Sequence, residues 1–323
     1  MPRSDDVDLM IKAETTTGTA PGTTGYLPMR VLSDSLGEET ASEASQELST
    51  SRGTTAEIDG GRTVTGSIET YLVKNEAIDE MLRGLMGESS WATGPPEILE
   101  PGSATPTFTL AKQITIGSGA GSTRRFEFNG LGFNSLEIDC QPQSAVTCTW
   151  GGVGGSMTAK SAAHFTAGTM TPTLENSPPM KTADMTFTWG GNYSGVTTAN
   201  TCHTSARISL NANADVRQCL TETSASEFEY GKFTGELEVT MLLTQEAHQL
   251  AMDWQDGDEG SCVVQFVDVP ASGSPNVYQL DFDRLKIRSA EIPTPSTGSD
   301  VLATFTFAIL QGTSTAAVTV TRS

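Results

Sequence analysis

The sequence predicts a mainly β protein, built as a β-sandwich or barrel flanked by two short helices. Many short runs of alternating apolar and polar residues are separated by glycine, proline, serine and asparagine, a pattern typical of strands and turns. Charged residues make up only 18% of the 323-residue chain, and amphipathic helical segments are few. A strand followed by a helix occurs twice, so we expect this strand–helix unit to be duplicated in the fold.

The first strand–helix unit begins at Val64. The apolar side chains of residues 64–72 recur at every second position, which predicts a strand with one buried face. Asn75 is placed to cap a helix over residues 76–86, and Gly87 is placed to end it. The buried face of this strand is expected to hold Val64, Ile68 and Leu72.

The second unit repeats this pattern from Phe233 onward. Residues 233–241 alternate in the same phase as the first strand, and both strands contain a Thr-Gly pair. A helix that begins near Glu246 and ends at Gly257 then follows. The matching core positions are Phe233, Leu237 and Met241.

Composition divides the chain into four segments. Residues 1–25 are polar and carry too little apolar surface to fold alone, so we expect a flexible N-terminal arm. Residues 26–150 form the first β half, which contains a long acidic loop over residues 35–61. Residues 151–205 are rich in glycine and threonine, which predicts an irregular insertion or connector. Residues 206–323 form the second β half with the C-terminal strands.

Charge and cysteine usage exclude several classes of protein. The formal net charge is −20, which argues against a nucleic-acid-binding protein of the usual basic kind. The N-terminus lacks the apolar core of a secretory signal, and the longest apolar stretch, residues 301–310, is too short to cross a membrane. Five cysteines occur singly, so we expect scattered reduced thiols in the core and assembly in a reducing cytoplasm.

No arrangement of side chains predicts catalysis, so we expect neither an enzyme nor a bound cofactor or metal. Cys202 and His203 have no second pair of residues that would complete a metal site. The acidic residues after the second helix lack the order of a calcium-binding loop, which favours a solvated helix end. The glycines of residues 117–121 lack the lysine that closes a phosphate-binding loop.

The order of several features is familiar. A loop rich in serine, threonine and glutamate ends in residues 60–72, and a short helix over residues 77–86 precedes Trp91. Residues 125–138, which contain Phe-Asn-Ser-Leu, come next. This order resembles the tail tube (major tail) proteins of long-tailed, non-contractile bacteriophages, in the subfamily with a longer chain. The second strand–helix block of that subfamily corresponds to residues 208–214 and 233–239.

The resemblance implies hexameric rings of β-sandwich subunits, stacked into a hollow tube. Genome DNA later passes through the bore without specific binding. The partners implied are further copies of the chain, a tape-measure protein, a tail terminator and distal tail proteins, without any membrane. The expected location is the virion tail, after assembly in the bacterial cytoplasm.

The same resemblance assigns roles to two sets of residues. The long loop would contact neighbouring subunits or rings, and the polar faces of the two repeated strands would line the bore. An acidic bore would repel DNA without anchoring it. The loop candidates are Glu38, Glu39, Glu43, Glu47 and Arg52. The bore candidates are Thr65, Ser67, Glu69, Thr234, Glu236 and Glu238.

Two alternatives belong to other classes of protein. A phage or bacterial adhesin, or another carbohydrate-binding β protein, would stack sugars on Trp150 and Trp189. Alternation with apolar neighbours instead favours core positions for both tryptophans. A metal-dependent hydrolase would use Asp253, Asp256 and Asp258, but the scarcity of histidine disfavours it.

Overall fold

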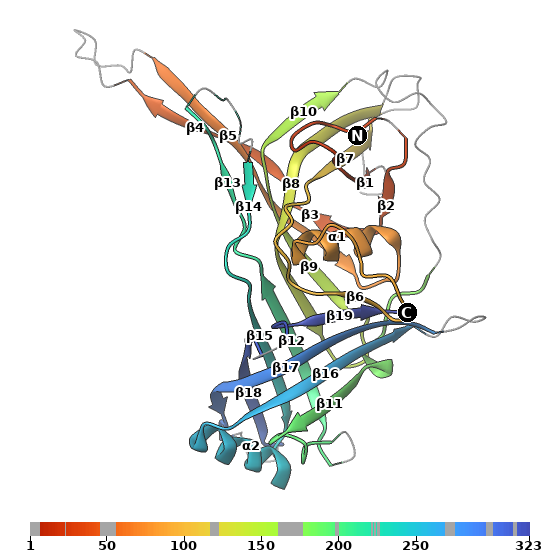
Figure 1. The fold of residues 1–323 in the computed structure, drawn as a ribbon, viewed down its shortest axis with the longest axis vertical. Coiled ribbons are helices and arrows are strands. Elements are labelled where there is room, and N and C mark those ends of the chain that lie inside the picture. Colours follow the sequence, from red (N-terminus) through yellow and green to blue (C-terminus); the bar gives the residue numbers. More distant parts are fainter. Residues whose placement is uncertain are drawn as a thin grey trace.

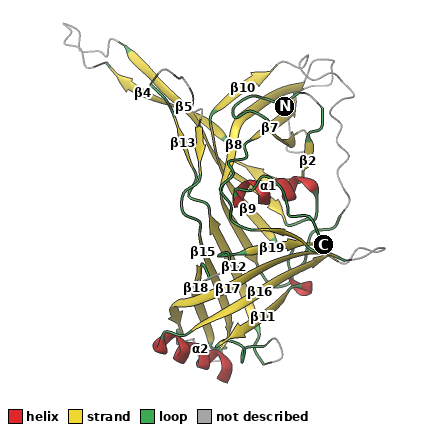
Figure 2. Cartoon of the chain, viewed as in Figure 1, coloured by secondary structure: helices red, strands yellow, loops and turns green. Residues whose placement is uncertain are grey.

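The computed structural model shows a mainly β fold. In Figure 2 strands dominate, and among the described residues helix is confined to α1, α2 and a short 3₁₀ helix at Thr182–Asp184. The predicted mainly β class with two short helices is therefore confirmed. The structure describes residues 7–22, 24–45, 56–116, 123–160, 177–197, 200–220, 222, 224, 227–268, 275–294, 300–312 and 315–323.

A long antiparallel sheet runs through the whole molecule. Each strand pairs with the next along backbone hydrogen bonds, and one face of the sheet is buried. On β5, for example, Val64 and Ile68 are fully buried while Thr65 between them is exposed. In spatial order the strands are β3 (Val31–Asp34), β5 (Glu57–Tyr71), β9 (Thr147–Gly154), β8 (Thr123–Cys140), β12 (His203–Asn211), β15 (Thr234–Leu242), β18 (Leu302–Leu310) and β17 (Asn276–Glu291). We call this the central sheet.

Two outer layers extend the central sheet through its longest strands, β8 and β17. Each long strand passes from the central sheet into an outer layer, and a β-bulge lies where β8 pairs with β9 and where β17 pairs with β18. A bulge bends a strand, which allows one strand to serve two layers. The first layer contains β2 (Leu27–Met29), β1 (Val7–Ala13), β7 (Phe108–Thr115) and β10 (Ser156–Lys160). The second contains β11 (Thr186–Gly191), β16 (Glu259–Asp268), β19 (Thr319–Arg322) and β6 (Glu97–Leu99).

Helix α1 begins and ends at the residues that the sequence predicts, and α2 begins one residue before the predicted Glu246. Asn75 caps α1 (Glu76–Met86) by accepting a hydrogen bond from the Ile78 amide at 2.8 Å, and Gly87 ends the helix in the left-handed conformation. Helix α2 (Gln245–Asp256) ends in the same way at Gly257. Helix α1 packs against β8, and α2 packs against β17 near the far end of the molecule (Figure 1).

The duplication predicted for a strand and a helix extends to the whole fold. In the first repeat β5, α1, β7, β8 and β9 come in this order, with the short β6 between α1 and β7, and β9 returns to pair with β5. In the second repeat β15, α2, β16, β17 and β18 follow in the same order, and β18 returns to pair with β15. The flanking strands also correspond, because β1 pairs with β7 as β11 pairs with β16, and β10 pairs with β8 as β19 pairs with β17.

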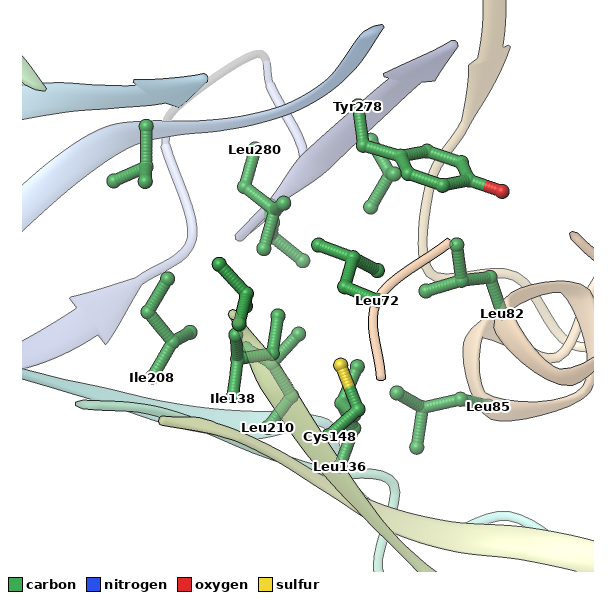
Figure 3. Close-up of a cluster of buried hydrophobic side chains, with 14 of the residues drawn as sticks. Leu72, Leu82, Leu85, Leu136, Ile138, Cys148, Ile208, Leu210, Tyr278 and Leu280 are labelled. Atoms are coloured by element: carbon green, nitrogen blue, oxygen red, sulfur yellow. The ribbon is translucent and has the colours of Figure 1, made fainter. Parts of the chain in front are cut away.

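The two repeats share a continuous hydrophobic core. Figure 3 shows leucines of α1, apolar side chains of the central sheet and two residues of β17 meeting in one cluster. Tyr278 of β17 is buried there, and its hydroxyl donates a hydrogen bond to Asp79 of α1 at 2.5 Å. The core residues predicted for the repeated strands are buried, except that Phe233 lies just before β15 and is only partly buried.

The prediction of a flexible arm over residues 1–25 is wrong for β1. Residues 7–13 form a strand between β2 and β7, and its centre is buried. Three consecutive apolar residues, Leu9, Met10 and Ile11, are covered because β1 packs on both faces, so the alternation typical of a half-buried strand is absent.

Two further segments are more regular than the sequence indicates. The predicted loop over residues 35–61 contains β4 (Gly37–Ala44), which pairs with the first half of β5 to form a hairpin. The predicted irregular segment 151–205 contains β10 and β11, although residues 161–176 lie outside the described residues. A separate two-stranded sheet is formed by β13 (Asp215–Arg217) and β14 (Glu227–Glu229).

Candidate functional site

The solvent face of the central sheet is a continuous polar surface that combines strands from both repeats. Backbone pairing places five residues opposite one another on this face, each on a neighbouring strand. In order across the sheet they are Glu69, Thr149, Glu137, Ser209 and Glu236. The two sets of residues predicted to line a bore, one on β5 and one on β15, therefore lie on one face of one sheet. We call this surface the polar face.

Carboxylates outnumber basic groups on the polar face. Arg207 donates to Glu137 at 2.5 Å, and this hydrogen bond raises the pKa of the Arg207 guanidinium. Arg288 lies 3.3 Å from Glu236. Both pairs are exposed and contribute little to stability, so their role is to balance charge locally. The acidic residues of the face are Glu69, Glu137, Asp139, Glu236, Glu238 and Glu291, and the basic residues are Arg207, Arg284, Lys286 and Arg288.

Hydroxyl groups fill most of the remaining positions of the polar face. Ser33 on the edge strand donates to Glu69 at 2.9 Å, and the hydroxyls of Ser35 and Ser67 lie 3.1 Å apart. On the same face, toward the other end of the sheet, the hydroxyls of Thr240 on β15 and Thr304 on β18 are hydrogen-bonded at 3.0 Å. Hydroxyl side chains carry no charge, so these positions add no positive group on which an anion would be held.

A hairpin of β4 and the start of β5 projects away from the rest of the molecule (Figure 1). Its outer part is exposed on both faces, and the Ile58 side chain on β5 is 59% exposed. An isolated two-stranded hairpin is only marginally stable in water, because it has no core of its own. This outer part carries Glu39, Glu43, Glu57 and Asp59, whereas the predicted residues Glu47 and Arg52 lie outside the described residues.

Glu38 lies at the base of the hairpin and contacts the body of the same chain. Its carboxylate accepts a hydrogen bond from the Met157 amide at 2.9 Å and lies 3.8 Å from Arg62. The side chain is only 12% exposed, so Glu38 braces the hairpin against β10. Of the five predicted loop residues, Glu39 and Glu43 are the described ones that remain exposed for contact with another subunit.

Both tryptophans of the adhesin alternative are buried. Trp150 is fully buried and donates to the Thr70 hydroxyl at 3.1 Å. Trp189 is 5% exposed and donates to Nε2 of His203 at 3.3 Å. His203 also stacks on Phe187, and burial lowers the pKa of its imidazole. Neither tryptophan forms a sugar-binding platform, and His203 uses its ring in packing.

The acidic residues of the hydrolase alternative do not converge. Asp253 is buried and accepts a hydrogen bond from Gln249 within the same helix, while Asp256 is exposed at the helix end. Across the part of the chain that the structure describes, no three histidine, cysteine or acidic side chains are grouped as metal ligands. The glycines at 117–121 lie outside that part. None of its helices is long and apolar enough to span a membrane.

The prediction of buried thiols holds for three of the five cysteines. Cys140, Cys148 and Cys262 are buried, and burial raises the pKa of each thiol, to about 12 for Cys140. Cys202 and Cys219 are exposed, because each lies in a connection outside the strands. All five are free.

The middle of the polar face was not predicted from the sequence. Glu137 and Asp139 of β8 and Arg207 of β12 lie between the two repeated strands. Their alternation with buried Leu136, Ile138 and Ile208 is the signal that places them on the solvent side. The order of strands that makes them central is not visible in that alternation.

Comparison with known proteins agrees with this architecture. A family model described as phage tail tube protein matches residues 4–309, which include most of both repeats. No curated protein matches the sequence. Because the match spans nearly the whole chain, this protein belongs to the phage tail tube protein family.

Proposed function

We propose that the chain is a structural subunit whose copies form stacked rings of six tail tube domains, with the polar face turned toward the bore. The observation that carries this proposal is the continuity of the face, since β5 and β15 present their predicted bore residues on the same side of one sheet. The opposite side of that sheet is buried by the core and the outer layers.

The chemistry of the polar face suits a conduit for DNA. Duplex DNA is densely and negatively charged, and a basic wall would bind it by releasing counterions. A wall with an excess of carboxylates and many hydroxyls repels the phosphates weakly and provides no fixed sites. Genome DNA would therefore pass without specific binding, and a tape-measure protein would occupy the same bore during assembly.

The projecting hairpin supplies contacts between subunits. Both of its faces are exposed in the single chain, which leaves its backbone and Ile58 to be covered by another copy. We assign the hairpin to contacts with an adjacent ring, while the ends of the tube would meet the tail terminator and distal tail proteins. The protein would act in the virion tail by self-assembly, after folding in the bacterial cytoplasm, without catalysis or a cofactor.

The accessibility of a thiol placed on the polar face tests this function. A Thr149→Cys variant, with the exposed Cys202 and Cys219 replaced by serine, should react with a large maleimide-polymer reagent as a monomer. In long tubes the reaction at Thr149→Cys should slow at least tenfold, because the reagent enters only from the ends.

The matched control is Gln255→Cys on the exposed side of α2, which should react equally fast in monomers and tubes. Equal labelling of Thr149→Cys in both states would show that the polar face is not the bore. The absence of tubes in negative-stain microscopy would contradict the function as a whole.

A further inference from the structure

The duplicated fold contains an interface between tail tube domains within one chain. The first repeat is joined to the second where β8 pairs with β12, from Ser135 opposite Asn211 to Cys140 opposite Ala206. This junction continues the central sheet from one repeat into the next without a gap.

The strands at the two ends of the central sheet correspond to the two strands of this junction. β17 corresponds to β8, because each is long, carries a bulge beside the returning strand and packs against the helix of its repeat. β3 corresponds to β12, because each pairs with the strand that carries the Thr-Gly pair. The two edge strands of the central sheet, β17 and β3, are thus equivalent to the two strands, β8 and β12, that pair at the junction inside the chain.

The glycines of the Thr-Gly pairs align the two repeats residue by residue. A Cβ atom on Gly66 would lie 2.7 Å from Cα of Leu36, and one on Gly235 would lie 3.0 Å from the Leu210 side chain. Leu36 therefore corresponds to Leu210. Gly66 lies opposite Gly152, and Gly235 lies opposite Ile309, so Thr149 corresponds to Thr306. On the long strands that pair with these residues, Glu137 therefore corresponds to Ser289 and Ile138 to Ala290.

Both ends of the central sheet lack the partner that the junction has. Within the described part of the chain, residues 287–291 of β17 pair with β18 alone, and β3 pairs with β5 alone. Ala290 is only partly buried, whereas its counterpart Ile138 is 2% exposed in the junction, and Ile292 beyond β17 is 41% exposed. Leu32 on β3 is 44% exposed. Unpaired strand edges with exposed apolar side chains are surfaces on which another strand adds.

We propose that β17 of one copy pairs with β3 of a second copy in the register of the β8–β12 junction, and that three copies close the ring. This inference rests on the proposed function for the number of domains, since six domains in a ring require three duplicated chains. The predicted neighbours across the contact are Ser289 with Ser35, Ala290 with Asp34 and Glu291 with Ser33. The six positions expected from the sequence are then filled by six domains of three chains.

The width of the resulting barrel agrees with three copies. Each chain contributes the eight strands of the central sheet. With strands about 4.8 Å apart and tilted by about 40°, three chains give a backbone barrel about 50 Å across, and six chains give about 100 Å. The narrower barrel encloses a single duplex closely, whereas the wider one would leave the duplex unguided.

Disulfide cross-linking in assembled tubes tests the register and the number of copies together. A Ser35→Cys, Ser289→Cys variant, in a background with Cys202 and Cys219 changed to serine, should form a ladder that ends at three linked chains after oxidation. The internal control is Glu137→Cys with Ser209→Cys, which are opposite in the junction and should link within one chain. Pairing Ser35→Cys with Glu291→Cys shifts the register by two residues and should not link, because disulfides require Cα atoms within about 7 Å.

The outcomes separate this inference from the proposed function. Tubes whose ladder continues to six chains, or tubes that do not link through positions 35 and 289, would overturn the three-chain ring and leave the tube function intact. Failure of the unmodified protein to form tubes would overturn the tube function itself. If the cysteine variant does not assemble, cryo-electron microscopy of unmodified tubes decides the number of chains, since threefold symmetry supports the proposal and sixfold symmetry of whole chains contradicts it.

Discussion

Asp79 joins the two repeats through a buried network of charges and hydrogen bonds. Its carboxylate accepts from the Tyr278 hydroxyl at 2.5 Å and forms ion pairs with Arg322 at 2.5 Å and Lys74 at 3.1 Å. Asp79 and Lys74 belong to the first repeat, whereas Tyr278 on β17 and Arg322 on β19 belong to the second. Asp79 is 7% exposed and Tyr278 1%, so water replaces few of these contacts.

We expect Asp79→Ala to lower the free energy of unfolding by about 3–5 kcal/mol, the cost of breaking a buried ion pair from one side. The variant leaves the buried Tyr278 hydroxyl without its acceptor, which by itself costs about 1–3 kcal/mol. Lys74 and Arg322 each retain 19% side-chain exposure and reach some water, which favours the lower part of the range. Tyr278→Phe should cost only about 1–2 kcal/mol, because Asp79 keeps both cations.

Urea-induced unfolding of the monomer, followed by tryptophan fluorescence, measures these changes. Glu76→Ala is the matched control, because Glu76 is an exposed acid at the start of the same helix and should cost less than about 1 kcal/mol. A loss below 1 kcal/mol for Asp79→Ala would refute the reasoning. Coupling between Asp79→Ala and Tyr278→Phe in a double-mutant cycle would assign the lost energy to their hydrogen bond.

Three further predictions concern the glycine of the repeat, the hairpin and the thiols. Gly235→Ala should destabilise the chain by about 1–3 kcal/mol, because the added Cβ would lie 2.7 Å from the Ile309 side chain. Gly37→Ala, which has open space around it, should be nearly neutral in the same unfolding assay. Deleting residues 38–57 should leave a folded monomer that forms no tubes in the electron microscope, and normal tubes would contradict the assignment of the hairpin. At pH 8 a thiol reagent should modify the exposed Cys202 and Cys219 quickly. The three buried cysteines should react only on unfolding, since burial also raises the pKa of their thiols. Rapid modification of all five would contradict their placement.

Features that depend on neighbouring residues were predictable from the sequence. Asn75 and Gly87 bound α1 because capping uses local side-chain and backbone geometry. The buried and solvent faces of β5 and β15 follow from the two-residue period of a strand. The polar residues of both strands could therefore be named as candidates for a bore.

Features that depend on distant contacts were missed. Residues 7–13 form a strand because β7, far along the chain, supplies its hydrogen bonds and its cover. The hairpin of β4 and β5 is polar on both faces, so no alternation marks it as strand. The bracing of Glu38 by the Met157 amide likewise depends on β10, which the sequence placed in an irregular segment.

The sequence by itself determined the two strand–helix units, their caps and the side of each strand that is buried, since local periodicity specifies these. Only the tertiary structure decided that β8 and β12 meet between the units and make a single polar face of both. The reason is physical: strands pair through backbone groups that are the same in every residue, so the choice of neighbour and register depends on how the whole core packs. That choice places Glu69 and Glu236 in one row and leaves β3 and β17 as the two ends of the central sheet.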